Sequence, residues 1–534
     1  MALPHNDSRK YELLISDIDQ GRLKLPRFQR DFVWNKEQTA RLIDSIIKGF
    51  PVGTFIIWKT HEELPSLLNI GNIALPKTPA GDAVQYILDG QQRITSLYAV
   101  RHGLRITRDG KEIDYKDICI DIDNKPDCDE ESVYTEKPED AGTTVSVHDL
   151  LTKDVTDFDD YTKEQRVRIQ TYRERLKGYD FSIIEISNQT IDVACEVFTR
   201  INTGGKALSI FEIIVAKTYN PDTGFDLEEK YSELIKDDEN PCLEDACFET
   251  LPPMTALQCL SAHLMGGITH KELIGLDKVA VANAWPHVRE TIFAAVEHLQ
   301  SHLGVAVSRL LPYPVLLVPF SRFFDKNGLK HASPEQSAWL RDYFYRCSLS
   351  NRFTSGVATK IAGDLLKMDQ IARGQSPNYN EDFNITAEHI VTRSFAINDS
   401  FSKAIICLLA SQGPKNLNNN GATKVNNTWL RKTSSKNIHH IFPKAFVKKA
   451  KQSGWDANLV ANVMIAEEYL NQRVIRAKAP KEYMKTFEDA NPGFRDSLKT
   501  HCIDDACLKA LMKNDYNSFT NQRARLIASE IKKS

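Results

Sequence analysis

The chain has 534 residues, of which 42% are hydrophobic and 26% are charged, a balance typical of globular proteins. At roughly 100–200 residues per domain, this length predicts about three domains. No stretch reaches the ~18 consecutive apolar residues of a membrane-spanning helix, and residues 1–7 lack the basic and apolar runs of a signal peptide. These features argue against a membrane protein, and we expect a cytoplasmic one.

The net charge of −3 hides an uneven distribution along the chain. Residues 401–534 contain 23 Lys and Arg against 11 Asp and Glu, a balance of +12, so the preceding residues carry −15. A basic module is the electrostatic footprint of a protein that meets a phosphate backbone. Charge alone leaves two interpretations open, a nucleic-acid-binding domain and a basic domain without a ligand.

The ten cysteines are scattered along the chain. The pairs Cys242/Cys247 and Cys502/Cys507 are each separated by four residues, which is not the CxxC spacing of a structural zinc site. A zinc site built from them and His501 is the weaker interpretation. Reduced thiols are the expected state in a cytoplasmic protein.

The first 220 residues have the pattern of an α/β domain. Short apolar runs with β-branched residues predict strands at 55–58, 86–89 and 181–186, and helical spacing of apolar residues predicts helices at 92–100 and 192–200. Residues 121–160 are acidic and poor in large apolar groups, so we expect an insertion or mobile loop there. Trp34 and Trp58 are expected in the core rather than stacked on a base.

The rest of the chain divides into a helical part and a basic module. Residues 227–373 have a helical pattern, and their apolar run 310–318 is too short to cross a membrane. Residues 415–427 are rich in asparagine and predict a loop or linker. The whole sequence therefore predicts a multidomain α+β protein.

Three short motifs of the front part place polar and glycine residues at predicted turns: 25–34 (LPRFQRDFVW), 88–95 (LDGQQRIT) and 198–206 (FTRINTGGK). In the second motif a strand ends at Asp89, Gly90 allows a tight turn, and a helix begins near Gln92. The free N–H groups and positive dipole end of such a helix suit a phosphate, and Arg93 would add a charged fork. Taken alone, the Asp-Gly pair is more typical of a plain turn than of a phosphate site. The sequence has no GxxxxGK[ST] motif, which excludes an ordinary P-loop.

The basic module contains the segment 437–443 (NIHHIFP), followed by Asn462 and Asn471. A histidine with a pKa of about 6.5 is largely neutral near pH 7 and can take a proton from water. A divalent cation can hold a phosphate and its leaving oxygen. Residues 462–471 predict a strand that enters a helix, which would return the second asparagine to the histidines. The alternative is a chance pair of core histidines.

A second segment, Glu388-His389 with Asn398, also has the opening of such a motif. Its surroundings are not basic, and the pairing with a second asparagine is poor. We interpret it as helix or loop.

The segment from His439 to Tyr483 resembles the ββα-metal core of HNH nucleases, in the version that ends the GmrSD-like restriction proteins (the DUF1524 type). The three front motifs resemble the DUF262 domain that opens the same proteins and is similar to the ParB nucleotide-binding fold. The resemblance therefore spans both ends of the chain, in the family's order. It implies a DUF262 ParB-like nucleotide-binding domain at 1–225, a helical connecting domain at 226–400 and a DUF1524-like HNH nuclease domain at 401–534.

The resemblance also implies roles for single residues. His440 would be the general base, and Asn462 would hold the loop that carries it through a backbone hydrogen bond. His439, where many relatives have Asp, and Asn471 would bind one Mg²⁺ or Mn²⁺ ion. The nucleotide pocket would be lined by Arg27, Gln29, Arg30, Asp89, Gly90, Gln91, Gln92, Arg93, Thr95, Asn202 and Gly205.

What the resemblance implies about function is a metal-dependent HNH endonuclease or nickase of anti-phage defence that senses modified or foreign DNA. GTP, ATP or CTP would be hydrolysed in the front domain and regulate cleavage. The partners would be DNA, a second copy of the chain or other defence-system proteins, with no membrane. Two alternatives stay open: a ParB-like NTP-binding, DNA-binding regulator with an inactive nuclease module, and an RNA-cutting toxin.

Overall fold

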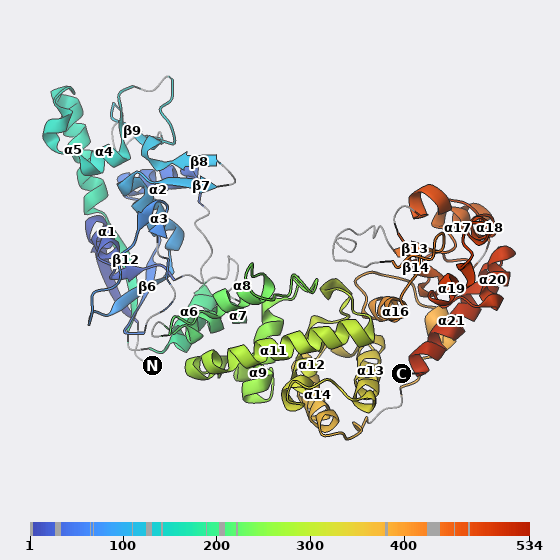
Figure 1. The fold of residues 1–534 in the computed structure, drawn as a ribbon. Helices are drawn as coiled ribbons and strands as arrows, with labels where there is room; N and C mark the ends of the chain where they lie inside the picture. Colours follow the sequence, from blue (N-terminus) through green and yellow to red (C-terminus); the bar gives the residue numbers. More distant parts are fainter. Residues whose placement is uncertain are drawn as a thin grey trace. The chain divides into compact units, whose positions relative to one another are not determined.

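The structure is a computed structural model in which the chain forms two compact units, residues 1–226 and 227–534 (Figure 1). It describes all residues except 1–3, 27–33, 63, 65, 68, 109–110, 124–130, 140–141, 188, 202–208, 221–222, 380–382, 424–437, 453, 468–469 and 534. The mixture of helices and strands expected from the sequence is confirmed. The division into three domains at 225 and 400 stays a prediction.

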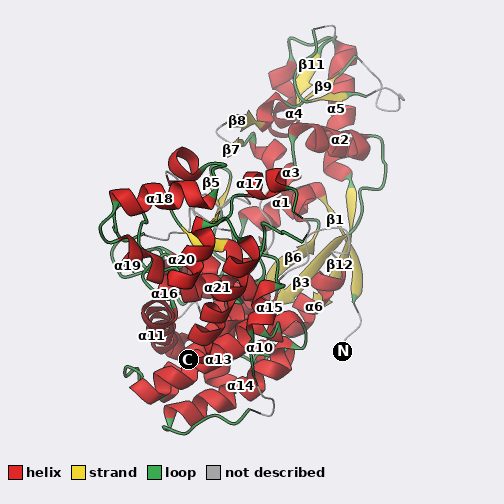
Figure 2. Ribbon diagram, turned by 90° about the vertical axis from the view of Figure 1, so that its right-hand side faces the viewer, coloured by secondary structure: helices red, strands yellow, loops and turns green. Residues whose placement is uncertain are grey.

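Unit 1 is built on a mixed five-stranded sheet with the order β1-β12-β3-β6-β2 (Figure 2). Its strands are β1 (His5–Lys10), β12 (Asp180–Ser187), β3 (Phe55–Thr60), β6 (Val84–Asp89) and β2 (Leu23–Lys24). β12 pairs in parallel with β3 and β2 in parallel with β6, whereas the pairs β1/β12 and β3/β6 are antiparallel. The three strands predicted from apolar runs are confirmed as β3, β6 and β12.

Each face of this sheet has its own apolar core. One core contains Tyr11, Ile57 and Leu97 and is covered by α1 (Tyr11–Asp19), α2 (Lys36–Ile47), α3 (Gln91–His102) and α5 (Lys163–Gly178). The other contains Trp58, Tyr86 and residues of α6 (Ile191–Ile201) and α7 (Ile210–Thr218). Trp58 is fully buried, which confirms its predicted place in the core.

Of the two expectations for residues 121–160, an insertion or a mobile loop, the mobile loop is wrong for the described part of that segment. A three-stranded sheet forms from β9 (Cys119–Asp121), β10 (Val133–Tyr134) and β11 (Thr144–Ser146), followed by α4 (Val147–Thr152). Val133, Val145 and Leu150 are buried in the core of unit 1. A few apolar residues at the right places suffice to anchor an otherwise acidic segment.

Two further hairpins are β4 (Asn69–Ile70) with β5 (Ile73–Ala74) and β7 (Arg105–Arg108) with β8 (Lys111–Asp114).

Unit 2 begins with the helical part that the sequence predicts. Its helices are α8 (Leu227–Ile235), α9 (Pro253–Met265), α10 (His270–Ile274), α11 (Lys278–Leu303), α12 (Leu317–Lys326), α13 (Pro334–Leu349), α14 (Val357–Ala372) and α15 (Ala387–Val391). α12 packs against α9, α11 and α14 (Figure 1). Among the described helices, none has both the length and the apolar character needed to cross a bilayer.

The end of unit 2 surrounds one small hairpin, β13 (Ile438–His440) with β14 (Val463–Ile465). The helices around it are α16 (Ser400–Ser411), α17 (Lys444–Ala450), a π-helical turn (Leu470–Ile475), α18 (Pro480–Ala490), α19 (Phe494–Lys499), α20 (Asp505–Met512) and α21 (Tyr516–Lys532). The loop or linker predicted at 415–427 is packed only in part, and Asn419, Gly421 and Ala422 are exposed. Asn416 and Leu417 are buried, and Asn491 donates to the Leu417 carbonyl over 2.9 Å.

Candidate functional site

The two candidate histidines end a strand of the β13/β14 hairpin. His439 lies opposite Met464 and His440 opposite Val463. Because neighbouring residues of a strand point to opposite sides, the two rings leave the hairpin on different sides. His439 is 3% exposed, whereas His440 is half-buried. The backbone bends directly after the pair, at Ile441, and Pro443 then caps the start of α17.

Asn462 is fully buried and ties the loop after His440 to the start of β14. Its Oδ1 accepts from the Phe442 N–H over 2.8 Å, and its Nδ2 donates to the Phe442 carbonyl over 3.0 Å. Nδ2 also donates to the Ala457 carbonyl over 2.8 Å. A side-chain amide can satisfy both polar groups of one residue in this way, which fixes the backbone two residues beyond His440.

Asn458 contacts the His440 ring and was not singled out from the sequence. Its Nδ2 donates to the Phe395 carbonyl over 2.8 Å, so its Oδ1 is the atom that lies 3.2 Å from Nε2 of His440. An amide oxygen can only accept, so this contact puts the proton of the neutral ring on Nε2 and leaves the Nδ1 lone pair available. The partner carbonyl is far away in sequence, and no local spacing rule could have indicated Asn458.

The surroundings of His440 favour its neutral form. Burial lowers the pKa of His440 to about 4, and the positive charge of Lys444 acts in the same direction. The Asn458 contact and the negative charge of Asp456 oppose this shift but do not cancel it. His440 is therefore neutral at physiological pH, the protonation state that a general base needs before it acts.

The loop between the two strands is held at further points by buried side chains. Tyr483 donates to the Ile441 carbonyl, and Tyr516 donates to the Asp456 carbonyl. Arg523, which is fully buried, donates to the carbonyls of Ala461 over 2.8 Å and Val463 over 2.6 Å. Backbone at both ends of the loop is thereby fixed to α18 and α21, which is the rigidity that a preorganised site requires.

Asn471 lies at the start of the π-helical turn Leu470–Ile475, a few residues after β14. The order strand, strand, helical turn thus matches the order expected from the sequence. The side chain of Asn471 lies outside the described residues, so its role as a metal ligand stays a prediction.

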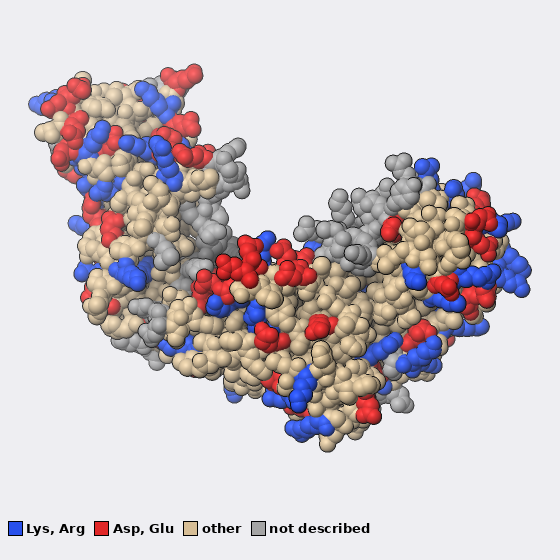
Figure 3. Space-filling model, in the orientation of Figure 1, with Lys and Arg blue, Asp and Glu red and all other residues tan. Residues whose placement is uncertain are grey.

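A lysine-rich helix follows the histidines directly. Lys444, Lys448 and Lys449 of α17 and the adjoining Lys451 are exposed. Elsewhere on the C-terminal helices, acidic and basic side chains are mixed, as the visible face shows (Figure 3). Among the described basic residues of this module, these exposed lysines on the helix that follows His440 are well placed to meet a phosphate backbone.

In unit 1, the turn at Gly90 has the predicted form. β6 ends at Asp89, and Gly90 has φ +96° and caps α3, which begins at Gln91, one residue earlier than expected. A Cβ at this glycine would lie 2.3 Å from the Phe55 ring, so both the backbone angle and the space require glycine. Gln91 and Gln92 are buried in the first turn of the helix.

Arg93 does not offer a free charged fork. Its Nη1 donates to the Val52 carbonyl over 2.7 Å, and its Nη2 donates to the Thr54 carbonyl over 2.9 Å and to Asp89 over 3.2 Å. The guanidinium also lies over the Phe55 ring. These contacts join the start of α3 to the turn before β3, so the described structure gives Arg93 a structural role.

The remaining residues of the predicted nucleotide pocket are only partly visible. Thr95 is 2% exposed, and its hydroxyl has no hydrogen-bond partner among the described residues. Gln92 Oε1 accepts from the Trp34 N–H over 3.2 Å. The pocket residues that lie outside the described part are Arg27, Gln29, Arg30, Asn202 and Gly205.

Comparison with known proteins gives two findings. Residues 11–219 match the family model of the GmrSD restriction endonuclease, N-terminal domain. An uncharacterized protein of Methanocaldococcus jannaschii is 22% identical to this chain, in an alignment that covers 99% of each of the two proteins. The first finding supports the resemblance of the front half to GmrSD-like proteins. The hairpin with His440 lies outside the matched residues.

Proposed function

We propose that this protein is a metal-dependent HNH-type endonuclease that hydrolyses DNA and acts in restriction-like defence against phage. The observation that carries the proposal is His440, a neutral, half-buried imidazole with an oriented proton at the end of β13, beside exposed lysines. The match of residues 11–219 to a restriction-endonuclease domain supports the choice of DNA as substrate and a role in restriction.

In the proposed reaction, a water molecule gives a proton to Nδ1 of His440 and its oxygen adds to phosphorus. The bond from phosphorus to one sugar oxygen then breaks. Asn458 keeps the ring in the tautomer that can accept the proton, and Asn462 holds the loop beside it. A phosphodiester next to Lys444 would offset the charge of that lysine and raise the pKa of His440 towards neutrality, which strengthens the base.

A divalent cation would stabilise the leaving oxygen, and His439 with Asn471 are the residues that would hold it. Both are neutral donors, and one is an imidazole nitrogen. Nitrogen donors suit Mn²⁺ better than Mg²⁺, which prefers oxygen. The donor types, an imidazole nitrogen and an amide oxygen, suit a divalent cation, and an ion beside His440 would require the His439 ring to turn towards that side of the hairpin. We expect Mn²⁺ to support more activity than Mg²⁺.

The proposal includes regulation by a nucleoside triphosphate (GTP, ATP or CTP) bound and hydrolysed in unit 1. Support comes from the N-terminus of the twelve-residue α3, which follows a left-handed glycine, and from the buried Thr95 hydroxyl in that helix. Gln91 and Gln92 lie in the same first turn. A homo-oligomer and other defence-system proteins remain proposed partners.

Supercoiled plasmid is expected to be nicked or cut by the full-length chain in Mn²⁺, more slowly in Mg²⁺, and not at all in excess EDTA. The assay uses modified and unmodified plasmid, with and without each nucleotide, and agarose gels separate the three topological forms. Plasmid that stays supercoiled under every condition, with protein bound to it, would instead favour a DNA-binding regulator with an inactive nuclease module. Cleavage of RNA alone would favour the toxin.

The positioning role of Asn458 predicts a shifted pH profile. In the wild type, the cleavage rate should fall as the pH drops through the low pKa of His440, because the protonated ring cannot accept a proton. Asn458→Asp places a negative charge beside Nε2, favours the imidazolium and should move this acid limb upward by about one pH unit or more.

The matched control is Asn521→Asp, the same change at an exposed position of α21. Initial rates from pH 4 to 8 give the two profiles. A merely structural role of Asn458 would lower the rate of Asn458→Asp at every pH and leave the midpoint in place, which would contradict the assignment.

A further inference from the structure

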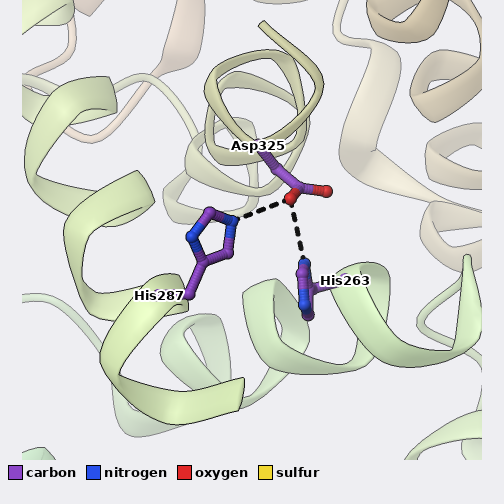
Figure 4. Close-up of side chains that lie close together, drawn as sticks. All are labelled: His263, His287 and Asp325. Atoms are coloured by element: carbon purple, nitrogen blue, oxygen red, sulfur yellow. Dashed lines mark hydrogen bonds and ion pairs between the residues drawn. The ribbon is translucent and has the colours of Figure 1, made fainter. Parts of the chain in front are cut away.

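A cluster of two histidines and one carboxylate lies in the helical part of unit 2, outside the hairpin described above. His263 comes from α9, His287 from α11 and Asp325 from α12, three helices that pack against one another. One ligand atom of each residue lies within 4.8 Å of those of the other two. Figure 4 shows that both rings face the same carboxylate oxygen.

We propose that His263, His287 and Asp325 form a binding site for a divalent transition-metal ion of the Zn²⁺ type. Nδ1 of His263 lies 3.1 Å and Nε2 of His287 lies 2.9 Å from Oδ1 of Asp325. An ion bonded to such atoms at about 2.1 Å keeps neighbouring ligands about 3.0–3.4 Å apart. The two nitrogen–oxygen separations therefore suit a shared ion after small side-chain movements.

The hydrogen bonding of the cluster is incomplete without an ion. His287 can donate to Asp325, but Nδ1 of His263 is buried and has no aligned hydrogen-bond partner among the described residues, despite its short distance to the carboxylate. A buried ring nitrogen held 3.1 Å from a carboxylate oxygen at a poor angle makes a weak hydrogen bond, or an ion pair when the ring is protonated. A metal ion between the two atoms would use the lone pairs of both.

The charges around the cluster select the class of ion. Lys326 and Arg322 lie 3.2 Å and 3.8 Å from Oδ2, the carboxylate oxygen that points away from the rings (Figure 4). Arg322 also pairs with Asp369 over 2.7 Å. The two cations balance the two carboxylates, so no surplus of negative charge attracts Ca²⁺ or Mg²⁺. The attraction for a metal ion would therefore come mainly from the two imidazole nitrogens, which favour transition metals.

Access and coordination number fit the same class. The side chain of His287 is 41% exposed, so an ion can enter from solvent, whereas that of Asp325 is 8% exposed. Three protein ligands leave a fourth position for water, unlike the four-ligand sites that are purely structural. Whether or not a water molecule occupies the fourth position, the bound ion would cross-link α9, α11 and α12.

The experiment is equilibrium dialysis of the full-length chain against Zn²⁺, with metal content measured by mass spectrometry. His263→Ala and His287→Ala should each lose one equivalent, with affinity at that site reduced by more than about a hundredfold, because the loss of a ligand exceeds the effect of outer-shell changes. His270→Ala, an exposed histidine of α10, should bind as much Zn²⁺ as the wild type. An ion at the C-terminal hairpin would be lost separately, in His439→Ala.

A second variant and a second measurement show whether a loss of Zn²⁺ results from unfolding. Asp325→Asn keeps nearly the same side-chain shape, and thermal melting reports whether each variant is folded. Zn²⁺ should raise the melting temperature of the wild type and of His270→Ala, and have little effect on that of His287→Ala or Asp325→Asn. Co²⁺ should give visible absorption bands that disappear in the same two variants. Folded His263→Ala and His287→Ala proteins that keep the full Zn²⁺ content of the wild type would overturn the proposal.

Discussion

Replacement of His440 by alanine is expected to lower the rate of plasmid cleavage by at least about 10²–10⁴-fold, the usual contribution of a general base. Asn458 and the end of β13 now hold the His440 ring in place. Without that ring, no neutral group is left there to accept a proton from a water molecule. DNA binding should change little, because the lysines of α17 remain. Gel-based rates and a binding titration measure the two effects on one preparation.

The matched control for His440→Ala is His389→Ala. His389 follows a glutamate in a similar local sequence, but the structure places it in α15, where its ring contacts Thr386 over 2.9 Å. This confirms the interpretation of that segment as helix, and we expect cleavage at the wild-type rate. A His440→Ala protein that cuts as fast as the control would remove the base from the proposed function.

The second large effect is expected on stability, from Arg523→Leu. Arg523 is fully buried, and its donors reach the carbonyls of Ala461, Val463 and His501. Burial lowers its pKa to about 10, so it stays charged at neutral pH. Leucine would leave three buried carbonyls without these donors, at a cost of about 1–3 kcal/mol each, and we expect a loss of about 4 kcal/mol in the free energy of unfolding.

Arg525→Leu provides the comparison, because Arg525 lies on the same helix but is exposed. Its free energy of unfolding should stay within about 0.5 kcal/mol of the wild type. Urea unfolding followed by circular dichroism measures both variants. Equal midpoints for the two would mean that the carbonyls find other donors, and that Arg523 is not what holds β14 to α21.

Much of the secondary structure could be predicted because its signals are local. The apolar runs of β3, β6 and β12 and the turn at Gly90 depend on residues that are neighbours in sequence. The acidic segment was misjudged because average composition hides the few apolar residues that anchor it, such as Val145 and Leu150. The sequence predicts a nucleotide-binding role for Arg93 because it does not show that the carbonyls of a distant turn, those of Val52 and Thr54, accept hydrogen bonds from its guanidinium.

The candidate site shows the same division between local and distant contacts. His440 and Asn462 belong to one segment of the sequence, residues 437–471, and their chemistry is visible in the residue types. Asn458 gains its role only because Phe395 holds its amide in one orientation. The cluster of His263, His287 and Asp325 has no sequence signature, since each residue comes from a different helix.

The sequence by itself determined the order of the parts: an α/β front, a helical middle and a basic end with two histidines before a turn. Only the tertiary structure decided which buried polar groups meet: it places the proton of neutral His440 on Nε2, directs Arg93 to backbone carbonyls, and brings the proposed metal site together from three helices. The physical reason is that residue type and spacing encode local conformation, whereas pKa values, tautomers and ligand sets depend on neighbours that the folding of distant segments supplies.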